Sequence, residues 1–410
     1  ALRYDGSDII GNDNQFTPLW NVGLRWNLHR EEFMKRWMWV DQFAVRGGFG
    51  YTGSIDKNAL PFVVMTLGQS VIYDGQTVPT SFSYPNPNVK WQTKQDMNVG
   101  LDLSLFDYRL ELGVNYYNNI TRDVLDRKAL PYSSGRSEVT ENVADIYNSG
   151  WEIDLGVTLL KNKSFQWYAK ANIAINDNKV KNTYYKDTKD LPKATLSNAH
   201  QFVENQPVNG WYGYKFAGIN PINGAVMTYT GNGEATLDMS VSGATWPIPS
   251  VFYLGNLTPP VVGGFSTSAN WKQLIFSANF EFKTGHKIKS FNTFRSLDAR
   301  NRHTSEANRW REPGDITNVP AMSEAFTTYS SYMYDILLEK GNYLRCSYMT
   351  LGYNLKPEWL HKIGFSTARL SFTAKDLFTV SSYSGIDPAL MGSFGYPNSR
   401  KYTITLNVGF

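Results

Sequence analysis

The feature that most constrains the fold of this chain is an alternation of apolar and polar residues that recurs from one end to the other. In 151–159, for example, Trp, Ile, Leu and Val alternate with Glu, Asp, Gly and Thr. A period of two residues is the pattern of a β-strand with one apolar and one polar face, whereas a helix would repeat every 3.6 residues. About eleven such segments occur, most of them close to the length that a tilted strand needs to cross a bilayer. They are 20–28, 43–51, 101–105, 110–116, 151–159, 167–175, 265–271, 276–282, 343–355, 368–378 and 402–410.

The polar faces of these segments carry Asp, Glu, Lys, Arg and Asn at mid-strand, which a water-filled lumen accepts and a dry sandwich core does not. No run of 18 apolar residues occurs, so helical membrane spans are excluded. We therefore predict an all-β fold, a transmembrane antiparallel β-barrel with short periplasmic turns and long extracellular loops. The predicted turns include 106–108 and 161–164, and the predicted loops are 55–94, 122–144, 177–260 and 287–341.

Two other folds are compatible with the alternation. A soluble or surface-attached glycan-binding β protein would also alternate and expose aromatic residues. A complete barrel of twelve strands with its own pore is the other alternative. The last segment favours a membrane barrel, because it alternates as far as the aromatic Phe410, whereas soluble chains more often end in a frayed polar tail.

Several function classes find little support in the composition and motifs. With 40 Lys and Arg against 36 Asp and Glu, and no block of like charges, the chain has no nucleic-acid-binding arm. The single cysteine, Cys346, is expected to be a buried thiol, and the five histidines are too dispersed for a zinc site. Gly48–Gly53 matches a dinucleotide fingerprint, but no helix pattern follows before Pro61. No catalytic motif was found, so we expect no enzyme activity, no metal and no cofactor.

Candidate ligand-binding residues lie in the long connections. Aromatic rings there can stack on sugars or peptide side chains, or can pack the loops against one another. The aromatic residues are Trp211, Tyr212, Tyr214, Trp246, Tyr253, Trp310, Tyr329, Tyr332 and Tyr334. A basic loop between His286 and Arg311 could bind an anion or could simply be solvated; it holds Arg295, Arg300, Arg302, His303 and Arg309. By contrast, Trp20, Trp26, Trp151, Trp167 and Trp271 are expected in aromatic girdles at the membrane interfaces.

A series of short motifs along the whole chain resembles the C-terminal half of the SusC/RagA-type TonB-dependent outer-membrane transporters. Each motif alone is weak, but they occur in the family's order. They are Arg3–Ser7, Lys90–Thr93 with Val99–Asp102, Asn148–Glu152, Gly210–Tyr214 with Gly218–Ile219, Gly255–Pro259 before Gly263–Phe265, Phe282–Gly285, Arg309–Trp310 with Pro313–Asp315, Tyr343–Arg345, Thr350–Tyr353, Asp376–Thr379, Tyr383–Pro388 and Tyr396–Pro397. Cys346 and Asp376 depart from the residue types usual in the family.

The resemblance implies that residues 1–410 form about 11–12 strands of a 22-stranded barrel in the outer membrane of a diderm bacterium. The plug domain and the N-terminal strands would then come from a complementary polypeptide. It also implies TonB-dependent import of an oligomeric glycan or peptide, with a SusD-like surface lipoprotein as a lid and TonB acting through the plug. On that account Trp211, Tyr212, Tyr214, Trp246, Arg309, Trp310 and Arg311 contact ligand or lid, and Phe410 is the signal recognised in barrel assembly.

Overall fold

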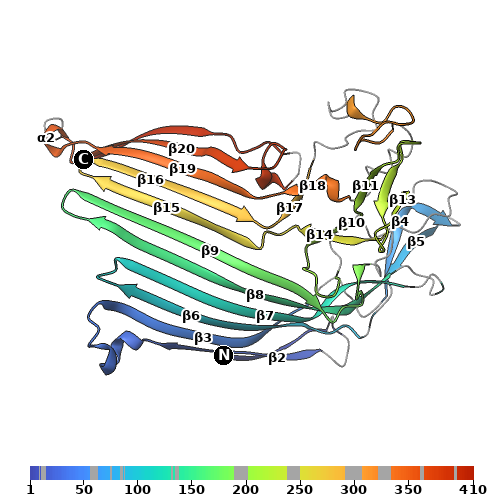
Figure 1. Cartoon of the computed structure of the whole chain (residues 1–410). Helices are drawn as coiled ribbons and strands as arrows, with labels where there is room; N and C mark the ends of the chain where they lie inside the picture. Colours follow the sequence, from blue (N-terminus) through green and yellow to red (C-terminus); the bar gives the residue numbers. More distant parts are fainter. Residues whose placement is uncertain are drawn as a thin grey trace.

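In the computed structural model, twelve antiparallel strands form one sheet in which each strand pairs with its neighbours along the chain (Figure 1). They are β1 (Leu2–Gly6), β2 (Phe16–Trp26), β3 (Val40–Ser54), β6 (Gln92–Leu105), β7 (Leu110–Ala129), β8 (Glu138–Lys161), β9 (Phe165–Lys181), β15 (Val261–Trp271), β16 (Leu274–Thr284), β19 (Tyr343–Asn354), β20 (Thr367–Ser381) and β21 (Lys401–Gly409). The structure describes residues 1–8, 10, 15–55, 63–73, 76–83, 86, 88–130, 133, 138–188, 202–237, 250–290, 307–321, 334–360, 364–391 and 395–410.

The two ends of the sheet differ, as predicted. Short turns join the strands at the left of Figure 1, where the chain also ends, and the longer connections lie at the right. Barrels of this kind place short turns in the periplasm and long loops outside the cell. The loop end carries β4 (Val64–Tyr73), β5 (Gln76–Ser83), β10 (Gly210–Gly213), β11 (Phe216–Ile219), β12 (Val226–Tyr229), β13 (Ala235–Leu237), β14 (Phe252–Asn256), β17 (Lys287–Lys289) and β18 (Leu338–Lys340).

The register assigns opposite faces to the polar and apolar residues of each strand. Residues that pair directly across antiparallel strands point to the same face. Asp102 pairs with Gly113, which pairs with Asp154, and this row lies on the lumen side. The adjacent row, Leu101, Val114 and Ile153, lies on the lipid side. On the lumen side the Asp102 carboxylate accepts ion pairs from Arg25 at 2.9 Å and Arg46 at 3.3 Å, as expected of a wet interior.

The predicted external loop over 122–144 is wrong, because β7 and β8 continue through most of it as a long hairpin. The strand pairing shifts register between Thr121 and Val124, and Asp123 has a positive φ of 56°. Such a bulge adds a residue and breaks the alternation of faces, so the sequence pattern ends where the strand does not.

The order of the sheet separates the remaining alternatives. It starts at β1 and ends at β21, which do not pair with each other, so a closed barrel of twelve strands is excluded. Gly48–Gly53 lies within β3, where its glycines belong to a paired strand. Cys346 is a buried free thiol, as predicted. No helix in the described part of the chain is long and apolar enough to cross a membrane.

The main hydrophobic core lies among the loops rather than between layers of the sheet. It packs Tyr214 and Tyr334, which are fully buried, against residues of β10, β11, β12 and the short helix η8 (Asp335–Leu337). We call this part of the structure the loop lobe; it comprises the described residues of 202–237, 250–257, 307–321 and 334–340. Because it is assembled from segments far apart in sequence, the loop lobe is a folded body and not a set of independent loops.

Candidate functional site

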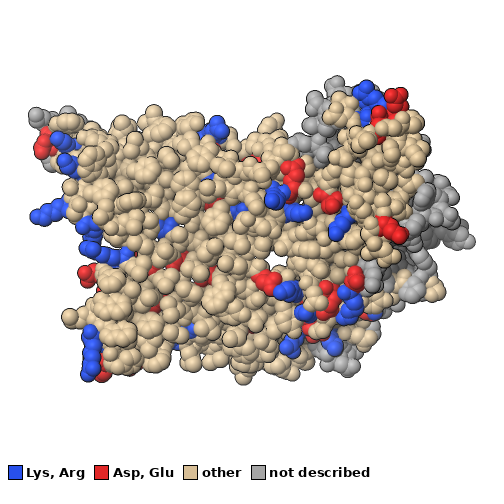
Figure 2. All heavy atoms as spheres, viewed as in Figure 1, with Lys and Arg blue, Asp and Glu red and all other residues tan. Residues whose placement is uncertain are grey.

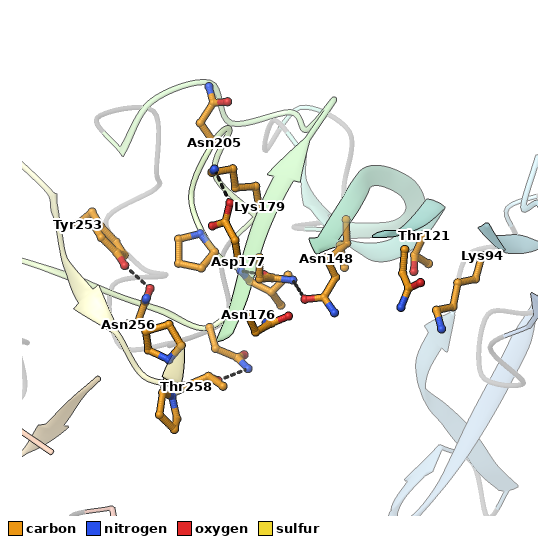
Figure 3. Close-up of a pocket in the computed structure, with 18 residues that line it drawn as sticks. Lys94, Thr121, Asn148, Asn176, Asp177, Lys179, Asn205, Tyr253, Asn256 and Thr258 are labelled. Atoms are coloured by element: carbon orange, nitrogen blue, oxygen red, sulfur yellow. Dashed lines mark hydrogen bonds and ion pairs between the residues drawn. The ribbon is translucent and has the colours of Figure 1, made fainter. Parts of the chain in front are cut away.

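A cavity of about 580 Å³ lies where the lumen side of the sheet meets the loop end (Figure 3). Its wall comes from β6, β7, β8 and β9, and its cover from residues 205–209 and 253–260. Seven of its lining residues are asparagines, and three are charged: Lys94, Asp177 and Lys179. The asparagines are Asn119, Asn148, Asn176, Asn178, Asn205, Asn209 and Asn256. We call this the asparagine cavity.

The wall of the cavity is a row of amides that runs across three strands. Asn119 of β7 pairs with Asn148 of β8, which pairs with Asn178 of β9. Neighbouring strands lie about 4.8 Å apart, so the three side chains project from the sheet at that spacing. The Asn178 amide nitrogen donates to the Asn148 side-chain oxygen at 3.4 Å. The row therefore follows from the register of the strands, and sequence spacing alone does not reveal it.

A second row lies beside the first, closer to the middle of the barrel. The Tyr117 hydroxyl donates to the Asn176 side-chain oxygen at 2.6 Å. Between them in the register is Gly150, where any Cβ would overlap the Tyr117 hydroxyl and the carbonyl oxygen of Ile175. Glycine at this position is thus what allows the tyrosine to cross the strand and orient the amide.

The cover of the cavity is held by hydrogen bonds from the same residue types. The Val208 backbone N–H donates to the Asn178 side-chain oxygen at 2.8 Å, and Asn209 donates to Thr258 at 3.0 Å. The Tyr253 hydroxyl donates to Asn256, and burial raises the pKa of Tyr253 to about 12, so this donor stays protonated. The first of these contacts attaches the cover to β9, and the other two join residues of the cover to one another.

Free hydrogen-bonding groups face into the cavity. Among the described residues, the Asn119 side chain has no hydrogen-bond partner, and the Asn148 and Asn176 amide nitrogens donate to no group. An amide offers both donors and an acceptor, which match either sugar hydroxyls or peptide groups. Both lysines of the lining form ion pairs, Lys179 with Asp177 at 2.6 Å and Lys94 with Asp96 at 2.5 Å. The cavity therefore suits an uncharged polar ligand. Elsewhere too, the part of the chain that is described contains no group of His, Cys, Asp and Glu that could hold a metal.

Three of the residues singled out in the sequence lie in the loop lobe but do not line the asparagine cavity. Tyr212 and Tyr214 are each 2% exposed and belong to the core of the lobe. Trp211 is partly buried and donates its indole N–H to the carbonyl oxygen of Lys287 at 2.9 Å. These contacts fit the second of the two predicted roles, in which the aromatic residues pack the loops against one another.

The other candidates of the lobe, Arg309, Trp310 and Arg311, lie within the segment 307–321. Trp310 donates its indole N–H to the carbonyl oxygen of Pro221 at 3.1 Å. The side chain of Arg311 donates to the carbonyl oxygen of Ala307 at 2.9 Å, and Arg309 forms an isolated bridge with Val319. A role of these residues in binding stays a prediction. Trp246, Arg295, Arg300, Arg302, His303, Tyr329 and Tyr332 lie outside the described residues.

A carboxylate anchors the loop after β20 to the lobe and makes it sensitive to acid. Glu339 accepts hydrogen bonds from the backbone N–H and the hydroxyl of Ser384 at 2.7 and 2.6 Å. Burial alone would raise the pKa of Glu339, but hydrogen bonds from Ser290 and Ser384 outweigh it and lower the pKa below its ordinary 4.5. A lowered pKa in the folded state stabilises the fold above pH 4.5, and this contribution is lost as the pH falls through the lowered value.

We therefore expect the amide of Ser384 to exchange faster at a pH below the lowered pKa of Glu339 than at pH 7, after correction for intrinsic exchange, because protonation removes the charge of the carboxylate and weakens it as an acceptor. Hydrogen exchange followed by mass spectrometry measures this. Glu339→Ala, which removes both acceptor oxygens, should give the fast exchange at both pH values. Equal protection of the wild-type loop at both pH values would contradict the expectation.

Comparison with known proteins shows which family of β-barrels the twelve-stranded sheet resembles. Residues 1–281 match the family described as TonB dependent receptor-like, beta-barrel. TonB-dependent receptor P3 of Formosa agariphila is 28% identical over 447 aligned positions, which cover all of this chain and 43% of that protein. TonB-dependent receptor SusC of Bacteroides thetaiotaomicron is 23% identical and is covered to 42%. The solved structure of the RagAB peptide transporter superposes over the whole chain with a TM-score of 0.78 and 26% identity, with 45% of that chain covered.

The chain thus spans less than half the length of these relatives, and the part it matches is barrel. The open sheet, its polar lumen face and its two unlike ends are the features of such a barrel segment. The chain belongs to the TonB-dependent receptor-like β-barrel family and is an outer-membrane protein.

Proposed function

We propose that this chain forms the C-terminal barrel wall of a TonB-dependent importer that carries an oligomeric nutrient, a glycan or a peptide, across the outer membrane. The observation that carries the proposal is the asparagine cavity on the lumen side near the extracellular end, in a chain whose fold is that of an importer barrel. Its unpaired amides form the kind of surface that binds and releases uncharged polar cargo without a deep apolar pocket.

The proposal includes the partners that such a segment needs. A complementary polypeptide supplies the remaining strands and the plug, and TonB acts on the plug. A SusD-like surface lipoprotein closes over the loop end, where the loop lobe and Trp211, Arg309, Trp310 and Arg311 offer it a folded surface. The name of the RagAB peptide transporter supports peptide as one cargo class, and the amides fit peptide groups and sugar hydroxyls equally.

Adjacent asparagines on opposite faces of β7 allow a matched test. Asn119 lies in the amide row, whereas Asn118 pairs with Met97 on the lipid side. We expect Asn119→Ala with Asn148→Ala to reduce uptake of the native cargo about 10-fold, since two buried hydrogen bonds to a neutral ligand are each worth roughly 0.5–1.5 kcal/mol. Growth on that cargo as sole nutrient and uptake of labelled cargo measure the effect in cells that carry the complete transporter.

Asn118→Ala is the control and should leave uptake unchanged. If both variants lose uptake equally while their amounts in the outer membrane are normal, the cavity is not the site of cargo contact. If neither variant loses uptake, the proposal that this cavity guides the cargo is wrong.

A further inference from the structure

Hydrogen bonds give the amides of the asparagine cavity a common direction. The Val208 backbone N–H donates to the Asn178 side-chain oxygen at 2.8 Å, and the Asn178 nitrogen donates to the Asn148 oxygen at 3.4 Å. A backbone N–H can only donate, so it fixes which end of the Asn178 amide is the acceptor. That amide in turn fixes the next one, and the Asn148 nitrogen is the group left over at the cavity.

Three further amides of the lining are held in the same sense. They are Asn176, Asn205 and Asn256. Their oxygens accept hydrogen bonds from Tyr117, Lys181 and Tyr253, respectively. In Figure 3 the dashed lines at Asn148 and Asn256 likewise end on the oxygen atoms. Within the described residues, these amides therefore have an occupied acceptor and a nitrogen that donates to no group.

Few side chains of the lining are held in the opposite sense. The Asn209 nitrogen is used within the cover, which leaves its oxygen free. Asn119 and the hydroxyl of Thr121 have no partner among the described residues and can either donate or accept. Four amides thus present only N–H groups to the cavity, whereas one presents only an oxygen.

The charges near the cavity occur in pairs of opposite sign. Where β7, β8 and β9 reach the loop end, Figure 2 shows blue and red groups side by side. The two lysines of the lining take part in such pairs, Lys94 with Asp96 and Lys179 with Asp177. Charge therefore gives the cavity little power to select a ligand, and the direction of its hydrogen bonds remains as the basis for selection.

A surface of N–H donors favours ligands whose oxygens accept hydrogen bonds without having to donate. The carbonyl oxygen of an amide or an ester is such an acceptor. A hydroxyl brings its own hydrogen, which finds few free acceptors in this cavity, and a polar group that loses water without gaining a partner weakens binding. Because the protein already holds the amides in place, a carbonyl ligand does not have to reorient them.

We propose that the asparagine cavity selects cargo by its carbonyl oxygens. A peptide backbone, or a glycan that carries acyl groups, binds there in preference to a glycan that has hydroxyls alone. The selection is set by the Val208 N–H, which acts through Asn178 on Asn148, and by Lys181, which acts on Asn205. It matters for import only if the cargo passes the cavity, and in that respect it rests on the proposed function.

Binding of small uncharged probes to the complete transporter in detergent, measured by titration calorimetry, tests the proposal. Diacetylchitobiose and cellobiose share one linkage and differ in that two acetamido groups replace two hydroxyls. We expect diacetylchitobiose to bind about 10-fold more strongly, because it can place two carbonyl oxygens on free N–H groups. Acetyl-triglycine amide should also bind more strongly than cellobiose. The tighter of the two carbonyl probes shows whether an acylated glycan or a peptide is the better source of the carbonyl groups.

Two substitutions of similar shape reverse the direction of the amides. In Asn178→Asp the carboxylate still accepts the Val208 N–H but cannot donate to Asn148, whose amide should turn its oxygen to the cavity. Asn148→Asp places an oxygen there directly. In both variants the preference for diacetylchitobiose over cellobiose should fall to about 2-fold or less. Asn279→Asp is the matched control, because it adds a carboxylate on the lumen face of β16 at a residue that does not line the cavity, and it should keep the preference.

Three results would overturn the proposal. One is binding of cellobiose as strong as that of both carbonyl probes. Another is an unchanged preference in Asn178→Asp and Asn148→Asp, and the third is an equal loss of preference in these variants and in Asn279→Asp.

The uptake test with Asn119→Ala and Asn148→Ala separates this proposal from the proposed function. Normal uptake by that double variant, together with the full preference of the wild-type complex for carbonyl probes, would mean that the cavity selects carbonyl groups but does not guide the cargo. Reduced uptake without any preference among the probes would mean that the cavity guides the cargo but does not select carbonyl groups.

Discussion

Refolded by itself into lipid vesicles, this polypeptide is expected to leave no protease-resistant, membrane-inserted species. The sheet ends at β21 on one side and at β1 on the other. Because β1 pairs only with the first part of β2 and Ala1 bonds to Asn21, residues 22–26 lack a strand partner on that side among the described residues. Unpaired N–H and C=O groups in a bilayer core cost roughly 2–7 kcal/mol each, so two open edges cost on the order of tens of kcal/mol.

That cost exceeds the roughly 5–15 kcal/mol by which proteins are stable, so complementary strands decide whether the chain inserts. The measurement is protease protection, together with the shift in gel mobility on heating that folded barrels show. Co-refolding with a polypeptide that supplies the missing strands should produce both signals. A protected, heat-modifiable band from this chain alone would contradict the expectation. It would mean that the edge strands β1 and β21, which are unpaired in the open sheet, have found partners.

Asp387→Ala is expected to detach the loop that follows β20. The Arg345 guanidinium of β19 contacts the Asp387 carboxylate at 2.6 Å, and the two side chains are only 5% and 9% exposed. The next acidic group, Glu281, is 3.9 Å from Arg345 and cannot replace this contact. Removal of one partner from a buried ion pair leaves an uncompensated charge and costs roughly 3–5 kcal/mol.

The same carboxylate also begins the short helix η10 (Pro388–Leu390), because it accepts the Ala389 N–H at 2.9 Å. The variant should therefore expose residues 382–391 to proteolysis and to hydrogen exchange, in the assembled transporter, by a factor of about 100 or more. Asp387→Asn keeps an acceptor for the Ala389 N–H and should lose less of the protection than Asp387→Ala does. Arg345→Leu with Asp387→Leu removes both charges and should recover much of the protection. Wild-type protection in Asp387→Ala would show that the ion pair does not hold the loop.

Most of the strand content could be predicted from local alternation. The segment 151–159 alternates without interruption and lies in β8, with its acidic residues on the lumen side. Prediction failed at 122–144, where the bulge at Asp123 breaks the alternation of faces. Those aromatic residues of the long connections that the structure describes lie at the loop end, but Tyr212 and Tyr214 are buried in a core that composition does not reveal.

The asparagine cavity could not be predicted. Asn119, Asn148 and Asn178 are each about thirty residues apart, and only the pairing of β7 with β8 and of β8 with β9 makes them neighbours. A usable signal was present, since each of them lies at a polar position of its strand. Without the register, however, nothing distinguished them from the other polar residues of the lumen face.

The sequence by itself determined that the chain forms strands with one wet and one lipid-facing side, because the side-chain direction in a strand alternates with every residue and is a local property. Only the tertiary structure decided which residues share a row, which loops form the cover of the cavity, and that the sheet stays open at β1 and β21. Those features depend on register and on contacts between segments far apart in the chain, which a local pattern does not encode.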